Sequence, residues 1–411
     1  MGLTMRERKA VTRQVAGRYG RAKKKEKGRM LDEFCEVTGY DRCYAARMLR
    51  AKGKRVDKER KSRDRKARGR EYGPELLEPL KKVWAIADGI CGKRLAAILP
   101  ELIARLEKFG ELRIAPEVKV LLMKISASTI DRMLAPERRR MQLKRRSGTK
   151  PGSLLKSAIP VRTFAQWDED APGFMEMDLV GHDGGDAKGE FIQTLNMVDV
   201  YSGWTETRAV KNKAQRWVFE ALQEIRSVLP FPLLGVDSDN GAEFINEPLA
   251  RYCRQEGITF TRSRPYRKND SCHVEQKNWT VVRRAVGYQR FETEGQLDTL
   301  NRIYGLLRLY TNFFQPSMKL VEKTRDGSKV TKRYDKPQTP YQRLLASGSL
   351  GPKEEERLSS LYHILNPALL QRRISSLQDK LKNPDAKQHK SIEKEVATPA
   401  DFECIFAEAT A

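Results

Sequence analysis

The 411-residue chain has few cysteines and histidines, and it has no long hydrophobic run. Its six cysteines contain no C-x-x-C pair, and its four histidines show no zinc-ligand spacing with them. This pattern excludes a Cys/His zinc domain and is typical of reduced thiols in a cytosolic protein. No apolar run approaches the roughly 20 residues that a membrane span needs, and the N-terminus lacks the apolar segment of a secretion signal. We therefore expect a cytoplasmic protein that does not contact a membrane.

Acidic residues are scarce relative to basic ones in the first third of the chain. Residues 1–150 hold 42 Lys and Arg against 19 Asp and Glu, a net charge of +23, whereas the remainder carries only +2. Such a skew predicts a polyanionic partner bound by the N-terminal part. A ribosome-associated protein or a protein of anionic membranes could share the skew, but DNA or RNA is favoured.

Two short helical patterns near the N-terminus predict a helix-turn-helix within residues 1–51. Apolar residues recur at helical spacing in 31–35 and in 44–49, and Gly39 lies in the turn between the two runs. The second helix would present three arginines to a DNA groove: Arg42, Arg47 and Arg50. Any two short amphipathic helices can give this pattern, so a pair of helices without DNA contacts remains the alternative.

Apolar stripes at helical spacing also predict a second helical domain, whose segment ISASTIDRML resembles another recognition helix. Ser126 or Ser128 would cap this helix, and Ser128 with Asp131 fits a capping box. Arg132 would then be a DNA contact. The alternative is a helical bundle that only packs against its neighbours.

From Trp167 onward the pattern changes to alternating strands and helices. The expected strands and helices, in chain order, are strands at 174–182, 190–198 and 204–210, a helix at 213–229, a strand at 232–236, a helix at 246–256, a strand at 257–263 and a helix from 275 to 293. In the first strand, the side-chain period of two puts Glu176 and Asp178 on the same side.

Three acidic residues stand at informative places among these elements. Asp178 lies in the strand FMEMDLV, Asp239 follows an apolar run in VDSDNGAEF, and Glu275 opens a helix after 35 intervening residues. Hard cations such as Mg²⁺ prefer carboxylate oxygens. Two such ions about 3.5–4 Å apart can activate the attacking oxygen at a phosphodiester and stabilise the leaving one. A cluster of three acids therefore suits phosphodiester chemistry.

Other acids in the region compete with these three, and SDNG is by itself a common turn sequence. The competitors are Glu176, Asp183, Asp186, Asp237, Glu243 and Asp270. Asp183 and Asp186 lie in a glycine-rich loop and are expected in solvent, and Asp237 either faces the core side or caps a loop.

Over roughly 168–315, the sequence resembles the D,D(35)E core of the DDE transposase and retroviral integrase superfamily. SDNGAEF and VEQKNW look more specifically like bacterial insertion-sequence transposases. The resemblance implies an α/β RNase H-like core with a mixed five-stranded sheet. The family motif aligns on the aspartate of Asp-Asn-Gly, so the resemblance favours Asp239 over Asp237, and the 35-residue gap to Glu275 then follows. It also implies that Asp178, Asp239 and Glu275 are catalytic and hold two Mg²⁺ ions, with Mn²⁺ as a substitute, and that Asp178 bridges both. Many relatives have Glu-Arg after the third acid region, whereas this chain has Gln276-Lys277.

The resemblance further implies a transposase that binds the ends of its element, cleaves DNA and joins it to a target. Its partners would be double-stranded DNA and further copies of itself, as a dimer or larger oligomer, in the bacterial nucleoid. Further DNA contacts would come from basic residues around the third acid: Lys268, Lys277, Arg283 and Arg284. The alternatives are a catalytically silent, transposase-derived repressor and an RNase H-like nuclease without joining activity.

The predicted organisation places all-α domains before the core and a small hairpin and helical region after it. Residues 52–70, with eleven basic residues, read as a linker. In order, we expect a helix-turn-helix region at 1–51, a basic linker at 52–70, a second helix-turn-helix domain at 71–137, a basic linker at 138–166 and the catalytic core at 167–315. The C-terminal region, 316–411, is expected to hold a hairpin around Asp326-Gly327, a helix at about 353–382 and a loosely ordered tail.

Overall fold

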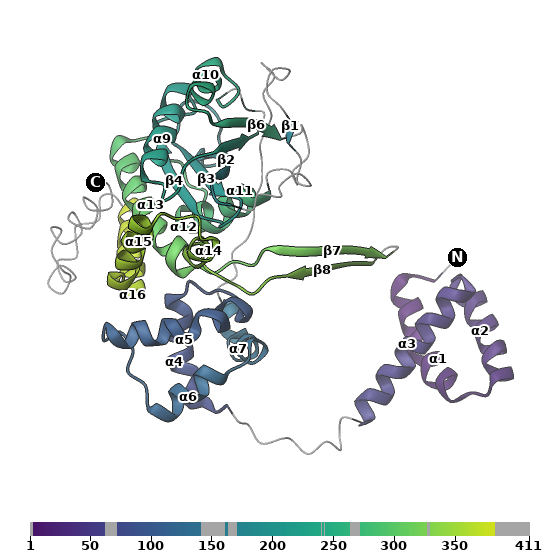
Figure 1. Cartoon of the computed structure of the whole chain (residues 1–411). Coiled ribbons are helices and arrows are strands. Elements are labelled where there is room, and N and C mark those ends of the chain that lie inside the picture. Colours follow the sequence, from purple (N-terminus) through teal and green to yellow (C-terminus); the bar gives the residue numbers. More distant parts are fainter. Residues whose placement is uncertain are drawn as a thin grey trace. The chain divides into compact units, whose positions relative to one another are not determined.

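The structure, a computed structural model, describes residues 3–61, 72–140, 161–162, 171–239, 241, 243–263, 272–326 and 329–382 (Figure 1). The chain divides into two compact units, Met1–Glu71 and Tyr72–Ala411. No helix in the described part of the chain is long and apolar enough to cross a membrane.

Residues 3–61 of the first unit form a bundle of three helices: α1 (Met5–Arg21), α2 (Lys24–Thr38) and α3 (Arg42–Lys61). Helix α2 ends at Gly39, whose φ of 67° lies in the left-handed region that glycine adopts without steric cost. Asp41 then caps α3, because its Oδ1 accepts the backbone N–H groups of Cys43 and Tyr44 at 2.9 and 3.1 Å. The two helices expected around Gly39 are present. Helix α3 continues to Lys61, so the segment expected as a linker begins as a helix.

The second unit opens with five helices around a leucine- and isoleucine-rich core. They are α4 (Leu77–Ile86), α5 (Gly92–Lys108), α6 (Pro116–Lys124), α7 (Ala127–Met133) and α8 (Ala135–Arg140). Ser126 caps α7 by accepting the N–H of Thr129 at 3.3 Å. The capping box expected for Ser128 and Asp131 is wrong, because Asp131 instead accepts the N–H of Gly92 at 2.7 Å and pairs with Arg138.

A mixed sheet follows, with the strand order β1-β6-β5-β2-β3-β4. Its strands are β1 (Val161–Arg162), β2 (Phe174–Gly181), β3 (Gln193–Asp199), β4 (Thr205–Val210), β5 (Gly235–Ser238) and β6 (Thr259–Ser263). Strands β2, β3 and β4 are antiparallel, whereas β2, β5, β6 and β1 run parallel. The five expected strands and their order with the helices are confirmed. The sixth, β1, is a two-residue edge strand inside the segment expected as a linker.

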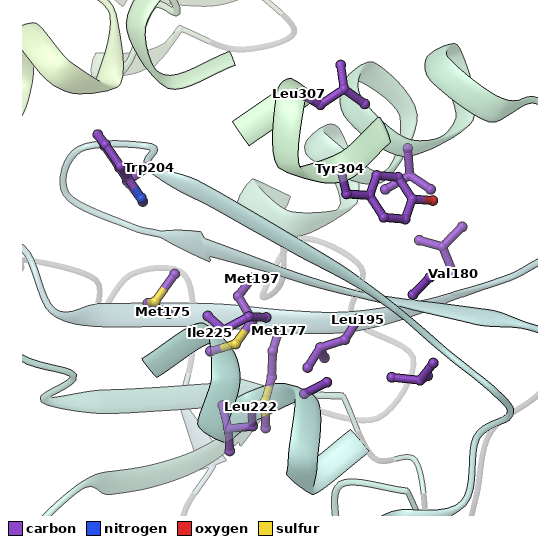
Figure 2. Packing of buried hydrophobic residues seen from close by; sticks show 14 of the residues in the cluster. Met175, Met177, Val180, Leu195, Met197, Trp204, Leu222, Ile225, Tyr304 and Leu307 are labelled. Carbon is purple, nitrogen blue, oxygen red and sulfur yellow. The ribbon is translucent and has the colours of Figure 1, made fainter. Parts of the chain in front are cut away.

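Helices cover both faces of this sheet. Helix α9 (Gln215–Val228) packs Leu222 and Ile225 against Met177 and Met197, on the opposite side of the sheet from Tyr304 of α13 (Figure 2). Helix α10 (Glu247–Gln255) connects the parallel strands β5 and β6. Parallel neighbours require such a crossover, and the loops at the strand ends are left free to carry functional groups.

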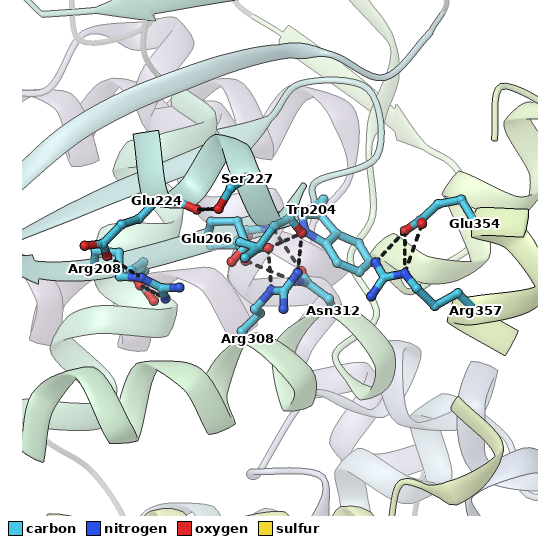
Figure 3. Close-up of polar contacts among 12 residues, drawn as sticks. Trp204, Glu206, Arg208, Glu224, Ser227, Arg308, Asn312, Glu354 and Arg357 are labelled. Carbon is cyan, nitrogen blue, oxygen red and sulfur yellow. Dashed lines mark hydrogen bonds and ion pairs between the residues drawn. The ribbon is translucent and has the colours of Figure 1, made fainter. Parts of the chain in front are cut away.

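The long helix α13 (Glu294–Phe314) closes the open edge of the sheet at β4. Asn312 accepts the N–H of Thr205 at 2.9 Å and donates to its carbonyl at 3.0 Å, and Asn301 does the same for Ala209. These side chains satisfy backbone groups that an edge strand would otherwise expose. Arg308 also reaches β4, where it meets the buried Glu206 at 2.6 Å (Figure 3).

The last described segments are a hairpin and three helices. Strands β7 (Leu320–Asp326) and β8 (Lys329–Tyr334) pair as expected, and the turn between them lies outside the described residues. Helices α14 (Pro340–Ser347), α15 (Pro352–Ile364) and α16 (Pro367–Lys382) follow. The single helix expected at 353–382 is wrong: it is two helices, because Pro367 disfavours helical geometry at the residue before it. The tail after Lys382 lies outside the described residues.

Candidate active site

Asp178 occupies the middle of β2, which lies between β3 and β5 in the sheet. Its Oδ1 accepts the N–H of Leu179 at 2.8 Å. Met177 pairs in register with Ser238, the last residue of β5, so Asp239 leaves the sheet beside Asp178. The strand order thus brings together two aspartates that lie 61 residues apart in the sequence.

Two successive side-chain amide hydrogen bonds hold the Asp178 carboxylate in place. Asn278 donates from Nδ2 to Asp178 Oδ2 at 2.6 Å, and Asn196 on β3 donates from Nδ2 to Asn278 Oδ1 at 2.8 Å. Asn196 is the cross-strand neighbour of Asp178, so the three side chains share one face of the sheet. Asn278 is not among the site residues predicted from the sequence. The signal that could have found it is its place one turn after Val274, on the face of the helix that meets the sheet.

The helix that carries Glu275 differs from the one expected. Helix α11 (Cys272–Lys277) begins before Glu275, passes into η3 (Asn278–Arg283), a wider π-helical turn, and continues as α12 (Arg284–Val286). It ends at Gly287, whose φ of 73° a helix cannot continue, so the expected end at residue 293 is wrong. Single π-helical turns are frequent at functional sites.

The negative charges of Asp239 and Glu275 act on Asp178. Burial, together with these two carboxylates, raises the pKa of Asp178 to about 7, although the hydrogen bonds from Asn278 and Leu179 oppose the rise. Asp239 and Glu275 themselves are exposed, and Asp239 accepts the N–H of Gly241 at 2.9 Å. In the described part of the chain, no three His, Cys, Asp or Glu side chains form a group that could hold a metal ion.

Two of the competing acids lie side by side on the same face of the sheet and are more deeply buried than Asp178 and Asp239. Glu176 and Asp237 are register neighbours on β2 and β5, and both are buried. Asp237 accepts the hydroxyl of Thr261 at 2.6 Å. Burial, together with the negative charge of Asp237, raises the pKa of Glu176 to about 8. Burial also raises the pKa of Glu243.

The remaining competitors lie elsewhere. Asp183 and Asp186 belong to a loop whose backbone carbonyls accept hydrogen bonds from Arg290. The side chain of Asp186 is exposed and that of Asp183 is partly exposed. Asp270 lies outside the described residues. The loop acids therefore take no part in the row of carboxylates on β2 and β5.

The basic residues predicted around Glu275 mostly contact protein groups. Lys277 is only 9% exposed, and burial, together with the charges of Arg94 and Arg343, lowers its pKa to about 7. Arg283 donates to the carbonyl of Gly181 at 2.8 Å, and Arg284 pairs with Asp88 at 2.8 Å. Lys268 lies outside the described residues. As DNA contacts, these four remain predictions.

The arginines predicted as DNA contacts in the helical regions are more accessible. On α3, Arg47 lies over the ring of Tyr44, Arg50 is exposed, and Arg42 is exposed although it pairs with Asp32. On α7, Arg132 donates to Thr129 at 3.3 Å. Contact of these side chains with DNA also remains a prediction.

Comparisons with known proteins agree with this architecture. The integrase core domain family matches residues 168–268. An uncharacterised protein of Sinorhizobium fredii, y4rM, is 41% identical over 343 residues, which cover 83% of this chain and 96% of that protein. The Gag-Pol polyprotein of avian reticuloendotheliosis virus is 31% identical over 111 residues, 26% of this chain and 9% of the polyprotein.

Solved structures similar to this chain are catalytic core domains of retroviral integrases. The core of BIV integrase has a TM-score of 0.29 at 19% identity and covers 43% of this chain and 95% of its own. The core of HTLV-2 integrase, solved with magnesium, has a TM-score of 0.27 at 17% identity. It covers 36% of this chain and 91% of its own. On the family match and the strand order, the chain belongs to the superfamily of DDE transposases and retroviral integrases.

Proposed function

We propose that this protein is a DNA transposase, which binds the ends of its element and catalyses metal-dependent cleavage and strand transfer. The observation that carries the proposal is the placement of Asp178 and Asp239 side by side on β2 and after β5, with the helix of Glu275 held to Asp178 through Asn278. The charges of Asp239 and Glu275 raise the pKa of Asp178. Carboxylates gathered without a cation destabilise one another, so such a cluster fits a cation-binding role. The integrase-type core supports the same reaction class.

The donor set fits Mg²⁺, because Asp178, Asp239 and Glu275 offer only the hard oxygen ligands that this ion prefers. Bound there, two ions would supply charge neutralisation at the phosphodiester and activation of the attacking oxygen. Asp239 and Glu275 are exposed, so we expect their side chains to turn toward Asp178 when metal binds. Asp178 would stay in place, because Asn278 and Leu179 already hold its two oxygens.

Two in-line displacements would complete the reaction. Water attacks the phosphorus at the element's end, and the bond to the 3′-oxygen breaks to leave a 3′-OH. That 3′-OH then attacks a phosphorus in the target, and the target's own 3′-oxygen leaves. No covalent protein intermediate is needed, so the side chains of this site orient groups and bind charge. Because two element ends must be joined, we expect a dimer or larger oligomer on DNA, in the bacterial nucleoid.

For binding of element ends, we propose helix α3 as the recognition helix of a helix-turn-helix. Ala45 and Leu49 face the core of the first unit, whereas Arg47 and Arg50 point from the exposed side. The Arg47→Ala, Arg50→Ala double variant should weaken binding of an element-end duplex at least about tenfold, since a good base contact contributes about 1–3 kcal/mol. If both arginines contact phosphates instead, the steepness with which the logarithm of the binding constant falls with the logarithm of the salt concentration should decrease by about 1.8.

A matched control removes two exposed charges from the surface of the integrase-type domain. Arg216 lies on α9 and Arg251 on α10, and both are exposed. Gel shifts across a salt series would compare the two double variants on the element-end duplex with unlabelled competitor DNA. Unchanged binding by the α3 variant would remove this helix from the interface.

Metal binding is expected to stabilise the protein in a pH-dependent way. The folded-state pKa of Asp178 is raised, so its contribution to stability is full below its unfolded value of 3.8 and is lost as pH rises through about 7. MgCl₂ should therefore raise Tm more at pH 8 than at pH 5. At a hundredfold excess over Kd, the rise at pH 8 should be on the order of 5–10 °C.

Differential scanning calorimetry with and without MgCl₂ measures this rise. Asp178→Asn should abolish it, and Asp186→Asn, which removes one exposed loop acid, should keep it. A full rise in the Asp178→Asn protein would move the metal site elsewhere.

One assay separates the proposed function from its two alternatives. A labelled duplex carrying the terminal repeat that flanks the gene is incubated with target DNA and MgCl₂, and cleavage and joining are scored. A transposase gives both products. Binding without cleavage would instead support a transposase-derived repressor, and cleavage without joining would support a nuclease.

A further inference from the structure

The side chain of Glu176 is fully buried in the middle of the molecule, with 0% exposure. Its one described ion-pair partner is the imidazole of His273, whose Nε2 lies 4.0 Å from Glu176 Oε1. This distance is longer than a hydrogen bond, and the imidazole is partly exposed. Burying a carboxyl group without a cationic partner is costly, so its position calls for an account other than an ion pair.

The hydrogen bonds of Glu176 supply that account. Its Oε2 accepts the backbone N–H of Val274 at 2.8 Å, across 98 residues of sequence, and its carboxylate also accepts from the backbone of His273. Helix α11 begins at Cys272, so these N–H groups belong to the first turn, which has no acceptor within the helix. A side chain from strand β2 therefore caps the helix that carries Glu275.

A second hydrogen bond joins this helix to β2. Asn278, the first residue of η3, donates to Asp178 at 2.6 Å, so β2 holds the helix at Val274 and again four residues later. In the sequence, Glu275 lies between these two attachment points.

We propose that Glu176 is a positioning residue: its carboxyl group fixes the first turn of α11 on β2 and so holds Glu275 beside Asp178. The proposal rests on the proposed function, in which Glu275 is a metal ligand. Glu176 itself does not contact the reacting groups. Its neighbour in the row, Asp237, has a different role, because its carboxylate accepts from Thr261 on β6.

Three substitutions separate capping from charge. Glu176→Gln keeps an acceptor oxygen at the same reach and removes the charge, Glu176→Asp keeps the charge but shortens the reach, and Glu176→Met removes both. A capping role predicts that the Gln variant stays within a few-fold of wild type, while the Asp and Met variants lose activity. Misplacing a catalytic group by about 1 Å costs on the order of a hundredfold, which sets the expected loss for Met.

The readouts are chosen to detect positioning rather than stability. The full-length variants are assayed with the labelled element-end duplex over a MgCl₂ titration, and Mn²⁺ binding is measured by calorimetry without DNA. We expect the Asp and Met variants to need more metal for half-maximal cleavage, with end binding unchanged. Glu206→Gln is the matched control, because it alters another fully buried glutamate, on β4, whose carboxylate pairs with Arg308 of α13. It should lower Tm without changing the metal requirement.

Amide hydrogen exchange tests the cap without any activity. The amides of His273, Val274 and Glu275 should exchange faster in the Asp and Met variants and at the wild-type rate in the Gln variant. If the Met protein does not fold, the comparison of Gln with Asp carries the test. An Asp variant that is more active than the Gln variant would overturn the proposal, as would wild-type exchange in the Asp variant. Inactive wild-type protein with the expected exchange pattern would contradict the proposed function but not the cap.

Discussion

Replacing Glu275 with Gln should reduce cleavage of an element-end duplex about a thousandfold or more. The substitution keeps the size of the side chain and removes its charge, so a Mg²⁺ site would lose one of three anionic ligands. Each 1.4 kcal/mol of lost transition-state stabilisation lowers the rate about tenfold. Glu275 is exposed, on a helix held by other residues, so the fold should not depend on its charge.

Cleavage and joining should fall together in this variant, because one site would serve both steps. Binding of element ends should survive, because we assign it to the N-terminal helices. Glu294→Gln, which removes a charge from the first turn of α13, is the matched control and should remain active. Near-normal cleavage by Glu275→Gln would exclude Glu275 as a ligand, whereas loss of DNA binding would indicate a structural role.

A second large effect should distinguish the two aspartates at the end of β5. Asp239→Asn should abolish detectable cleavage, a loss of about a thousandfold or more. The protein should keep its wild-type Tm, because Asp239 is exposed and the amide oxygen of Asn can still accept the N–H of Gly241. Asp237→Asn keeps an oxygen that can accept the hydroxyl of Thr261, so its activity should stay within about tenfold of wild type.

Parallel assays of the two variants, with Tm measured for each, make this comparison. Activity in Asp239→Asn beside inactivity in folded Asp237→Asn would reassign the site to the deeper row of acids. The 35-residue spacing would then be a coincidence.

The order of strands and helices in the core was readable from the sequence, because each element has a strong local pattern. The stripe of apolar residues on α9 and the alternation in β2 follow from periods of 3.6 and 2. The errors arose where a local pattern met a specific residue. Gly287 ends the Glu275 helix early, Pro367 divides the C-terminal helix, and Asp131 leaves its capping box for a tertiary partner.

By itself, the sequence determined the class of protein and the identity of three candidate acids, because residue types and spacings survive without coordinates. Only the tertiary structure decided what surrounds those acids. Asn196, Asn278 and Glu176 come from two strands and a helix, and their contacts depend on strand register and on helix docking. A hydrogen bond that joins residues 98 or 100 positions apart leaves no periodic signal in the chain. The physical reason is that local patterns record which face of an element is buried, whereas the partner on that face is chosen by packing.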